Sequence, residues 1–364
     1  MPMSVFRIEM LPARHGDCLW IEYGDEAEVH RILIDGGPVT TFALIAARLD
    51  QVPMGSRVFD LVVLSHVDAD HVEGLVRLFA EKPLPFVVRE VWFNGWRQMR
   101  PQHGLLGPVQ GEFLSALLAR RVPGAWQPDG APWVVPDAGP LPAFDLPGGM
   151  TLTLLSPSTA TLEEMAEAWA PVVTKAGIPP GNLDAAWAAL AKKKKFLPRE
   201  GLLGASPDLD ALLRAQFVED DAPANGSSIA MLAECGGKRA LLLADAFPGV
   251  VSGSLARLCA ARGLDRLEVD AVKVSHHGSK FNTDEALLRQ VRSPAYLIST
   301  NGEQFHHPDA ECLARIVSLG GPERLYFNYR SAFTEPWLSE AAQAEHGYVA
   351  TVREADAPLL RVEL

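Results

Sequence analysis

The stretch Leu64-Ser65-His66-Val67-Asp68-Ala69-Asp70-His71 places four potential metal ligands, two imidazoles and two carboxylates, within six residues. The apolar run 59–64 predicts a buried strand, and residues 72–80 show the spacing of a helix, so the four side chains stand on the loop between these elements. Carboxylates at this density repel each other unless a cation neutralises them. The stretch therefore predicts a metal site, around which the rest of the chain can be interpreted.

The composition is that of a folded globular protein. The chain has 364 residues, 48% hydrophobic and 21% charged, which provides a large core for one domain with or without an insertion. A formal net charge of -12 argues against a surface coated with basic residues for nucleic acid, although it leaves room for a local patch that guides a phosphate chain. Charge alone therefore leaves the substrate class open.

The cysteines and the apolar segments predict the cellular compartment of the protein. The four cysteines include no Cys-x-x-Cys pair, and no charged start followed by an apolar run marks a signal peptide. No apolar segment approaches the roughly 18 residues that span a bilayer. We expect a cytoplasmic protein with no membrane partner, and the sequence indicates no oligomeric state.

Strand and helix patterns alternate in two halves, and ligand-bearing loops follow the strands. This pattern predicts an α/β fold, an αβ/βα four-layer sandwich with a site between its two sheets. Segments 326–328, 348–352 and 359–362 are expected to finish the second sheet. The other predicted strands are 5–10, 18–23, 31–34, 59–64, 86–93, 151–155, 229–233, 240–243, 269–275 and 295–299, and the predicted helices are 42–49, 72–80, 250–261 and 311–319.

The metal loop resembles the His-x-His-x-Asp-His signature of the metallo-β-lactamase fold, with Asp68 in place of the second His. In this form it is similar to the hydrolase domain of the ComEC competence (DNA uptake) proteins and to phosphorylcholine esterase. The segment Ser275-His276-His277-Gly278-Ser279 resembles a second motif of this family. Weaker matches follow the same chain order, at residues 15–18, 34–37, 156–157, 225–228 and 301–308.

The resemblance implies two divalent metal ions, zinc or manganese or both, with one carboxylate shared between them. Because Asp68 replaces an imidazole and no later His clearly completes the first site, we expect the first ion to be held by fewer and harder ligands. His103 is the only His between His71 and His276, and ComEC-like members lack a ligand in this interval. The implied ligands are His66, Asp68 and Asp245 for the first ion, and Asp70, His71, Asp245 and His277 for the second.

The resemblance also implies roles beyond metal binding. Asp35 would support the metal loop from behind, although an Asp beside two glycines is also typical of a plain turn. One of His276 and His277 would be a ligand and the other would face substrate or bridging water, and the Gly after His277 favours that residue as the ligand. The candidate catalytic residues are Asp70, His276 and either His307 or His306 at the leaving group.

Residues 159–221 change to Ala, Leu and Trp at helical spacing with no strand signal. We interpret this segment as a helical insertion within one domain, 1–364, and the resemblance implies that it caps the site. Its run Lys192–Lys195 is either a solvated helix end or a phosphate contact. Trp96 and His103, in the loop after residue 93, are candidates for either core packing or substrate contact.

Three carboxylates against two divalent ions leave a formal charge of +1, which suits a bridging hydroxide and an anionic substrate. The sequence therefore predicts a metal-dependent phosphodiesterase or nuclease, with DNA or RNA as the substrate class by resemblance. Two alternatives remain open at this point. One is an amide or thioester hydrolase of the same fold, and the other is a non-catalytic binding module stabilised by metal.

Overall fold

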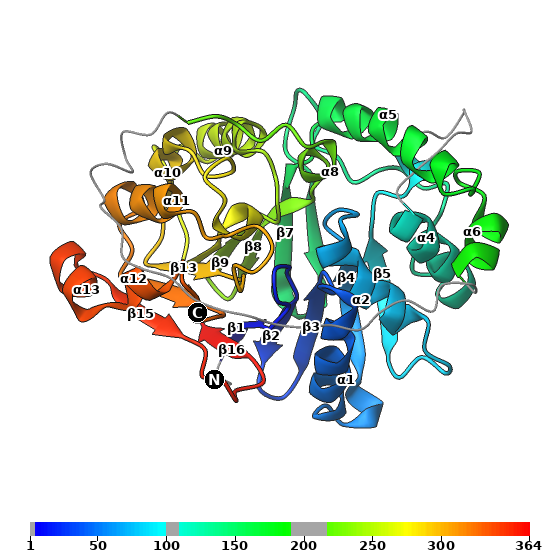
Figure 1. Ribbon diagram of the computed structural model, residues 1–364, viewed down its shortest axis with the longest axis horizontal. Helices are drawn as coiled ribbons and strands as arrows, with labels where there is room; N and C mark the ends of the chain where they lie inside the picture. The colour runs from blue at the N-terminus through cyan, green and yellow to red at the C-terminus, as the bar shows by residue number, and fades with distance from the viewer. Residues whose placement is uncertain (1–3, 100–108, 191–216) are drawn as a thin grey trace.

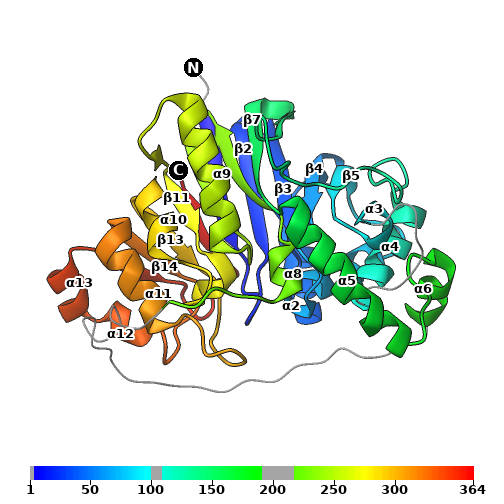
Figure 2. The same ribbon diagram turned by 90° about the horizontal axis from the view of Figure 1, so that it is seen from above.

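Two β-sheets face each other and carry helices on both outer faces (Figure 1). The computed structural model of the chain describes residues 4–99, 109–190 and 217–364. From above, helices α9, α10 and α11 lie on one side of the sheets and α2, α4, α5 and α6 on the other (Figure 2). The predicted αβ/βα four-layer sandwich is therefore confirmed.

The first sheet has six strands in the order β16-β1-β2-β3-β4-β5. Strands β1, β2 and β3 form an antiparallel meander, whereas β3, β4 and β5 are parallel and are connected by crossovers. Their bounds are β1 Ser4–Met10, β2 Leu19–Asp25, β3 Val29–Ile34, β4 Val58–Val63, β5 Val87–Trp92 and β16 Leu360–Glu363, and the helices of this half are α1 Phe42–Asp50, α2 Ala69–Phe79, α3 Trp96–Met99, α4 Val109–Arg121, α5 Thr159–Lys175, α6 Leu183–Leu190 and α8 Pro223–Gly226.

The second sheet has eight strands in the order β15-β14-β13-β11-β9-β8-β7-β6, of which β9, β11, β13, β14 and β15 run parallel. A short parallel pair, β10 with β12, lies beside it. The bounds are β6 Ala143–Leu146, β7 Met150–Ser156, β8 Ala230–Cys235, β9 Lys238–Leu242, β10 Leu267–Glu268, β11 Ala271–Lys273, β12 Val291–Arg292, β13 Ala295–Ile298, β14 Arg324–Phe327 and β15 Val349–Val352, and the helices are α9 Pro248–Arg262, α10 Glu285–Gln290, α11 Ala310–Arg315, α12 Glu335–Leu338 and α13 Glu340–His346.

The last strand belongs to the first sheet, so the expectation that residues 359–362 finish the second sheet was wrong. Strand β16 pairs antiparallel with β1, with Arg7 opposite Glu363. Its apolar residues Leu360 and Val362 join the core between the sheets. An alternating pattern predicts a strand and its buried face, but it does not name the neighbouring strand.

Three separate apolar layers hold the four structural layers together. Alternate residues of one strand serve different layers, since Ile21 packs between the sheets while Trp20 packs under the helices of the first half. The third layer lies between the second sheet and α9, α10 and α11. Strands buried on both faces explain the continuous apolar runs in the sequence.

Helices α5 and α6 are built into the first half. Trp169 and Val173 of α5 are buried in the same apolar cluster as residues of α2 and α4. Ser158 begins α5 with a capping box, because its hydroxyl accepts from the Thr161 amide and the Thr161 hydroxyl accepts from the Ser158 amide.

The Lys192–Lys195 run and His103 lie outside the described residues. None of the described helices combines the length and the apolarity that a membrane span requires.

Glu112 connects α4 to the turn before α6. Its Oε1 accepts a hydrogen bond of 2.8 Å from the Gly181 amide, and the side chain is buried. Burial raises the pKa of Glu112 to about 7, against the opposing effect of the Gly181 hydrogen bond. The ordinary value for an unfolded chain is about 4.3, so the folded state prefers the protonated form.

This preference predicts how stability depends on pH. A carboxyl with a raised folded-state pKa favours folding below the unfolded value, and the contribution is lost as pH rises through the folded value near 7. Relative to Glu112→Gln, the wild type should therefore lose roughly 3 kcal/mol of unfolding free energy between pH 4.5 and pH 8. Urea denaturation of both proteins across this range measures the difference. A difference that does not change with pH would contradict the prediction.

Candidate metal centre

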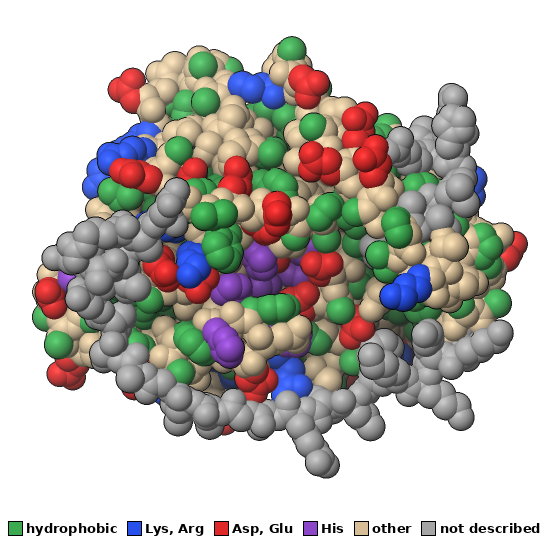
Figure 3. Space-filling model, turned by 45° about the horizontal axis from the view of Figure 1, so that its top comes forward, with side chains coloured by type: hydrophobic (Ala, Val, Ile, Leu, Met, Phe, Trp, Pro, Cys, Tyr) green, Lys and Arg blue, Asp and Glu red, His purple; other side chains and the backbone are tan. Residues whose placement is uncertain are grey.

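The loops that carry the candidate ligands meet at one edge of the sandwich. Asp35 follows β3, the 64–71 loop follows β4, Asp245 follows β9 and the turn Ser275–Gly278 follows β11. Because these strands are parallel within each sheet, their carboxyl ends reach the same edge. Figure 3 shows His side chains gathered in a hollow near the middle of one face, flanked by acidic side chains.

Asp245 lies at the centre of the cluster. Its Oδ2 is 3.5 Å from the Nε2 of His71, 3.7 Å from those of His276 and His277, and 3.8 Å from that of His66. Two ligands of a tetrahedral zinc ion with bonds of about 2.0 to 2.1 Å stand roughly 3.3 Å apart. These separations are therefore close to those of atoms that share a cation.

The two remaining carboxylates of the loop lie at different depths. The Oδ2 of Asp70 is 3.6 Å from His277 Nε2 and 4.0 Å from His71 Nε2, and the side chain is largely buried. Asp68 has a half-exposed side chain whose Oδ2 is 3.7 Å from His66 Nε2. Asp70 thus lies on the His71 and His277 side of Asp245, and Asp68 lies at the mouth on the His66 side.

Hydrogen bonds at Nδ1 fix the tautomers of His71 and His277. Nδ1 of His71 donates to Asp35 Oδ2 at 2.8 Å, and Nδ1 of His277 donates to the Ser299 carbonyl at 3.0 Å. A carboxylate and a carbonyl only accept, so Nδ1 carries the hydrogen in both rings. The two Nε2 atoms then face each other at 3.3 Å, and in neutral imidazoles neither can donate. A cation between them removes the conflict.

The Ser65 hydroxyl fixes the tautomer of His66 in the same way. The Ser65 hydroxyl donates to Asp35 Oδ2 at 2.7 Å, so its oxygen is free to accept from His66 Nδ1 at 3.1 Å. Both His66 Nε2 and Asp245 Oδ1 are buried without a hydrogen-bond partner among the described residues. Buried polar atoms of this kind are normally satisfied. The donor set and its unmatched atoms therefore fit divalent metal ions.

Asp35 is the acceptor behind the metal loop. It is buried at a positive φ of 60° and accepts from the Ser65 amide as well as from Ser65 Oγ and His71 Nδ1. Its loop packs tightly on α2, because a Cβ on Gly74 would overlap the Gly36 carbonyl. A Cβ on Gly36 would in turn overlap the Leu75 amide, and Gly37 has a positive φ of 65°, which explains the Gly-Gly pair after Asp35. The carboxylate is thereby held against His71 and, through Ser65, behind His66.

The charges in the cluster compensate one another. Burial disfavours the cation of His277, but the carboxylates of Asp245 and Asp17 outweigh it and raise the pKa of His277 to about 10. Although the Asp68 side chain is half-exposed, the partial loss of water around its carboxyl, together with the nearby Asp70, raises the pKa of Asp68 to about 6, and burial lowers the pKa of His66 to about 4. In the metal-free protein, protons thus supply the positive charge that the carboxylates require, and metal binding must displace them.

Asp17 and Lys273 form a buried ion pair beside His277 that the sequence analysis missed. Lys273 Nζ is 2.6 Å from Asp17 Oδ2, and Asp17 Oδ1 is 3.5 Å from His277 Nδ1. The ammonium holds the pKa of Asp17 well below its usual range despite burial. The Lys273 ammonium also lies where a metal ion would have to bind this carboxylate, which argues against Asp17 as a metal ligand. A lysine inside the apolar run 271–274 was the available signal, because a buried charge needs a partner.

The structure brings His307 beside the cluster and leaves His306 outside it. The His307 ring is buried, 5.4 Å from that of His276, and its Nδ1 is 3.3 Å from Asp309 Oδ2. His306 is exposed and packs on Phe333, at a ring distance of 5.5 Å. Trp96 is buried against Trp169 of α5, which favours the packing interpretation of that residue.

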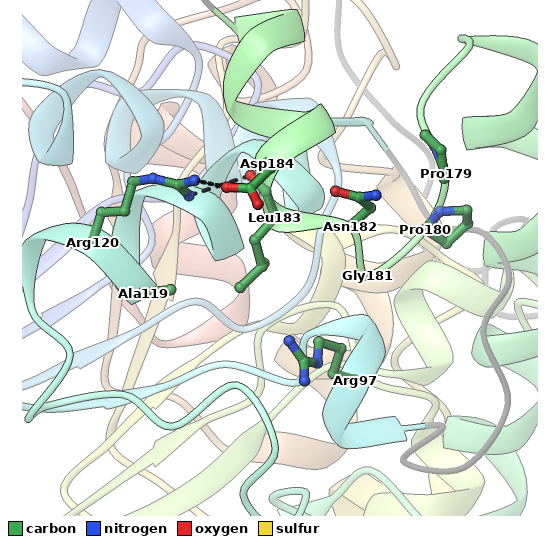
Figure 4. A pocket seen from close by; sticks show the side chains of 9 residues that line it. All are labelled: Arg97, Ala119, Arg120, Pro179, Pro180, Gly181, Asn182, Leu183 and Asp184. Carbon is green, nitrogen blue, oxygen red and sulfur yellow. Dashed lines mark hydrogen bonds and ion pairs between the residues drawn. The ribbon is translucent and has the colours of Figure 1, made fainter.

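A separate surface hollow of about 790 Å³ lies between α4 and the turn before α6 (Figure 4). Arg120 is paired with Asp184, and Arg97 is paired with Asp129 at 2.7 Å, so both guanidinium groups are already neutralised. None of the residues of the metal cluster lines this hollow. It therefore contributes nothing to the chemistry at Asp245.

Comparisons with known proteins give only distant likenesses. No protein-family model matches the chain, and neither does any curated protein. Among solved structures, CmlA beta-hydroxylase (E377D mutant) aligns with a TM-score of 0.37 at 14% identity, over 100% of this chain and 54% of that chain. Zn(2+)-bound PqqB from Methylobacterium extorquens aligns with a TM-score of 0.38 at 12% identity, over 95% and 87%.

This chain thus spans about half the length of the β-hydroxylase. Likenesses this distant do not bear on activity, and the fold assignment rests on the four layers, their strand order and the loops that meet between the sheets. The chain has a metallo-β-lactamase fold. Within that fold, the edge between the sheets holds a His and Asp cluster able to bind metal.

The buried ion pair predicts a non-additive effect on stability. Lys273→Met removes the closest cationic partner of the buried Asp17 carboxylate, which should lower the unfolding free energy by about 3 to 5 kcal/mol. The double variant Lys273→Met/Asp17→Asn should recover most of this loss, because the carboxylate that lost its ammonium partner is then also gone. Urea denaturation of the metal-free proteins measures both values. Lys238→Met, which breaks the exposed pair with Asp270, should cost less than about 1 kcal/mol. Equal losses in the single and double variants would contradict the prediction.

Proposed function

We propose that the protein is a metal-dependent phosphodiesterase that acts on DNA or RNA with two divalent ions, zinc or manganese. The observation that carries the proposal is the position of Asp245, whose Oδ2 is surrounded by imidazole Nε2 atoms, with Asp68 beside His66 and Asp70 beside His277. One carboxylate between two groups of ligands suits a pair of adjacent cations.

The residues of the cluster define the charge and the ligands around each ion. Three carboxylates facing two divalent ions leave a formal charge of +1, which favours an anionic substrate over a neutral amide or thioester. When bound, such ions lower the pKa of water and stabilise negative charge on a phosphoryl group. The residues that would hold them are His66, Asp68 and Asp245 on one side, and Asp70, His71, Asp245 and His277 on the other.

Aromatic rings form a rim beside the cluster. Phe305 is 45% exposed and lies between His15, at a ring distance of 5.9 Å, and His307, at 6.1 Å with nearly parallel rings. The loop before β2 that carries His15 reaches Asp70 directly, since a Cβ on Gly16 would overlap the Asp70 carbonyl. An exposed phenyl group next to a cationic centre suits a substrate that joins a phosphate to a planar base.

The hydrolytic activity has a direct test. Hydrolysis of bis(p-nitrophenyl) phosphate should stop on chelation and return with Mn²⁺ or Zn²⁺. Asp70→Ala should lower kcat/KM by more than 100-fold, which exceeds the roughly 10 to 100-fold cost of losing an outer contact to a metal ligand. Asp221→Asn, at an exposed position, is the matched control. Turnover of nitrocefin or thioesters alone would instead support the amide or thioester hydrolase, and a bound metal without any hydrolysis would support the binding module.

The rim predicts a preference for substrates that carry a base. Phe305→Ala should raise KM for a single-stranded oligonucleotide by about 5 to 150-fold, because one stacked base contributes about 1 to 3 kcal/mol. The variant should bind metal like the wild type, since Phe305 touches no candidate ligand of the cluster except through the intervening His307 ring. Met54→Ala removes an apolar side chain that is even more exposed, in the turn before β4, and serves as control. An unchanged KM would show that bases do not contact the rim.

A further inference from the structure

His276 occupies a position that the sequence did not assign to a metal. Its Nε2 is 3.7 Å from Asp245 Oδ2, the same distance as that of His277 Nε2, and the residue is held at a positive φ of 44°. The ring is mostly buried, with 20% of the side chain exposed. His276 therefore has the same geometry toward Asp245 as the other ligand candidates. Its tautomer depends on which group hydrogen-bonds to Nδ1.

The orientation of Asn282 decides that state. Asn282 is fully buried, and its Nδ2 donates to Asp220 Oδ2 at 2.8 Å and to the Asp245 carbonyl at 3.2 Å. Both partners only accept, so the amide nitrogen of Asn282 must face them. Its oxygen is thereby directed at His276 Nδ1, 2.8 Å away. The hydrogen on His276 therefore resides on Nδ1, and the lone pair on Nε2 points toward Asp245.

Asp220 is the anchor of this arrangement. Its carboxylate accepts from the Ala222 amide at 3.0 Å and from the side chains of Asn225 and Asn282, each at 2.8 Å, and lies 3.2 Å from His276 Nδ1. A carboxylate only accepts hydrogen bonds, so these contacts fix Asn282 and, through it, His276.

The positions of the neighbouring acids separate the imidazoles into two groups. Asp70 lies beside His71 and His277, with distances of 4.0 and 3.6 Å to their Nε2 atoms. Asp68 lies beside His66, 3.7 Å from its Nε2. Among the described residues, His276 reaches Asp245 but, unlike His71 and His277, forms no ion pair with Asp70. His276 is therefore separated from the acid of the second ion and suits the first ion, where the sequence left one protein ligand unfilled.

We propose that His276 is a ligand of the first ion, completing His66, Asp68 and Asp245, and that Asp220 and Asn282 are positioning residues that hold it in the metal-binding tautomer. The inference rests on the two-ion site of the proposed function but not on its substrate. It replaces the expectation that the first ion has fewer ligands than the second. It also connects the 159–221 segment to the metal centre through its next-to-last residue.

Cadmium in the wild-type protein tests the ligand directly. In [¹⁵N]histidine-labelled protein loaded with ¹¹³Cd, NMR should show scalar coupling to cadmium at Nε2 of His66, His71, His276 and His277. Coupling at the other three imidazoles but not at His276 would overturn the inference while leaving the two-ion site in place. Absence of coupling at all four would overturn the metal site itself, and with it the proposed function.

Zinc titration of metal-free variants tests the same point by affinity. Wild type should bind two ions per chain. His276→Gln should weaken the first ion by at least 100-fold and change the second by less than about 3-fold. His307→Ala, which removes the neighbouring ring, should keep both ions. Two ions bound by His276→Gln with wild-type affinity would overturn the inference, and a single ion bound by the wild type would contradict the proposed two-ion function instead.

The positioning role has its own matched pair. Asp220→Asn should weaken the first ion by about 10 to 100-fold, the usual cost of disturbing the partner of a metal-bound His, whereas Asp221→Asn should bind like the wild type. In the metal-free variant, the ¹⁵N shifts of His276 should report loss of the pure Nδ1–H tautomer, an effect that loss of packing alone would not produce. Unchanged shifts and unchanged zinc affinity in Asp220→Asn would overturn the role of Asp220.

Discussion

The interaction on which the structure depends is the convergence of imidazole Nε2 atoms on one buried carboxylate oxygen, Asp245 Oδ2. Such a cluster of acceptors is unfavourable without positive charge, because neither lone pairs nor carboxylates stabilise one another in a buried environment. The polar groups around the cluster hydrogen-bond to the Nδ1 atoms, on the side of each ring that faces away from Asp245. The Ser299 carbonyl, the Asp35 carboxylate and the Asn282 amide each occupy an Nδ1 and so turn an Nε2 inward.

Building this centre strains the backbone locally. Asp35, His276 and His277 have positive φ values, as does Ala244 beside Asp245, although side chains with a Cβ rarely adopt this conformation. Strain of this kind persists where the surroundings determine the conformation, and it is common at functional sites. Here the surroundings are the three apolar layers of the sandwich, which are rigid enough to hold four distant loops at one edge.

The sheets are also joined electrostatically at this edge. Asp17 comes from the loop before β2 in the first sheet, and Lys273 comes from β11 in the second, so their ion pair crosses the sandwich directly under His277. A buried pair adds little net stability compared with an apolar pair, but it fixes one geometry because any other leaves a charge unpaired. The helices α5 and α6 add a further constraint, since they share a core with α2, the helix that begins in the metal loop.

The sequence by itself determined the main strands, the helices α1, α2, α9 and α11 and the loop at residues 64–71, because periodicity and ligand chemistry are local properties of the chain, but it did not predict α4 or the short helices α10, α12 and α13. It could not determine which ring nitrogen carries a proton or which of two adjacent histidines faces which ion. Those choices depend on residues far away in the sequence, such as Asn282 for His276 and Asp35 for His71. The partner of β16, the pairing of Asp17 with Lys273 and the separation of His306 from His307 were likewise decided only by tertiary structure. Each requires knowing which groups lie within hydrogen-bond or packing distance after the two sheets close on each other.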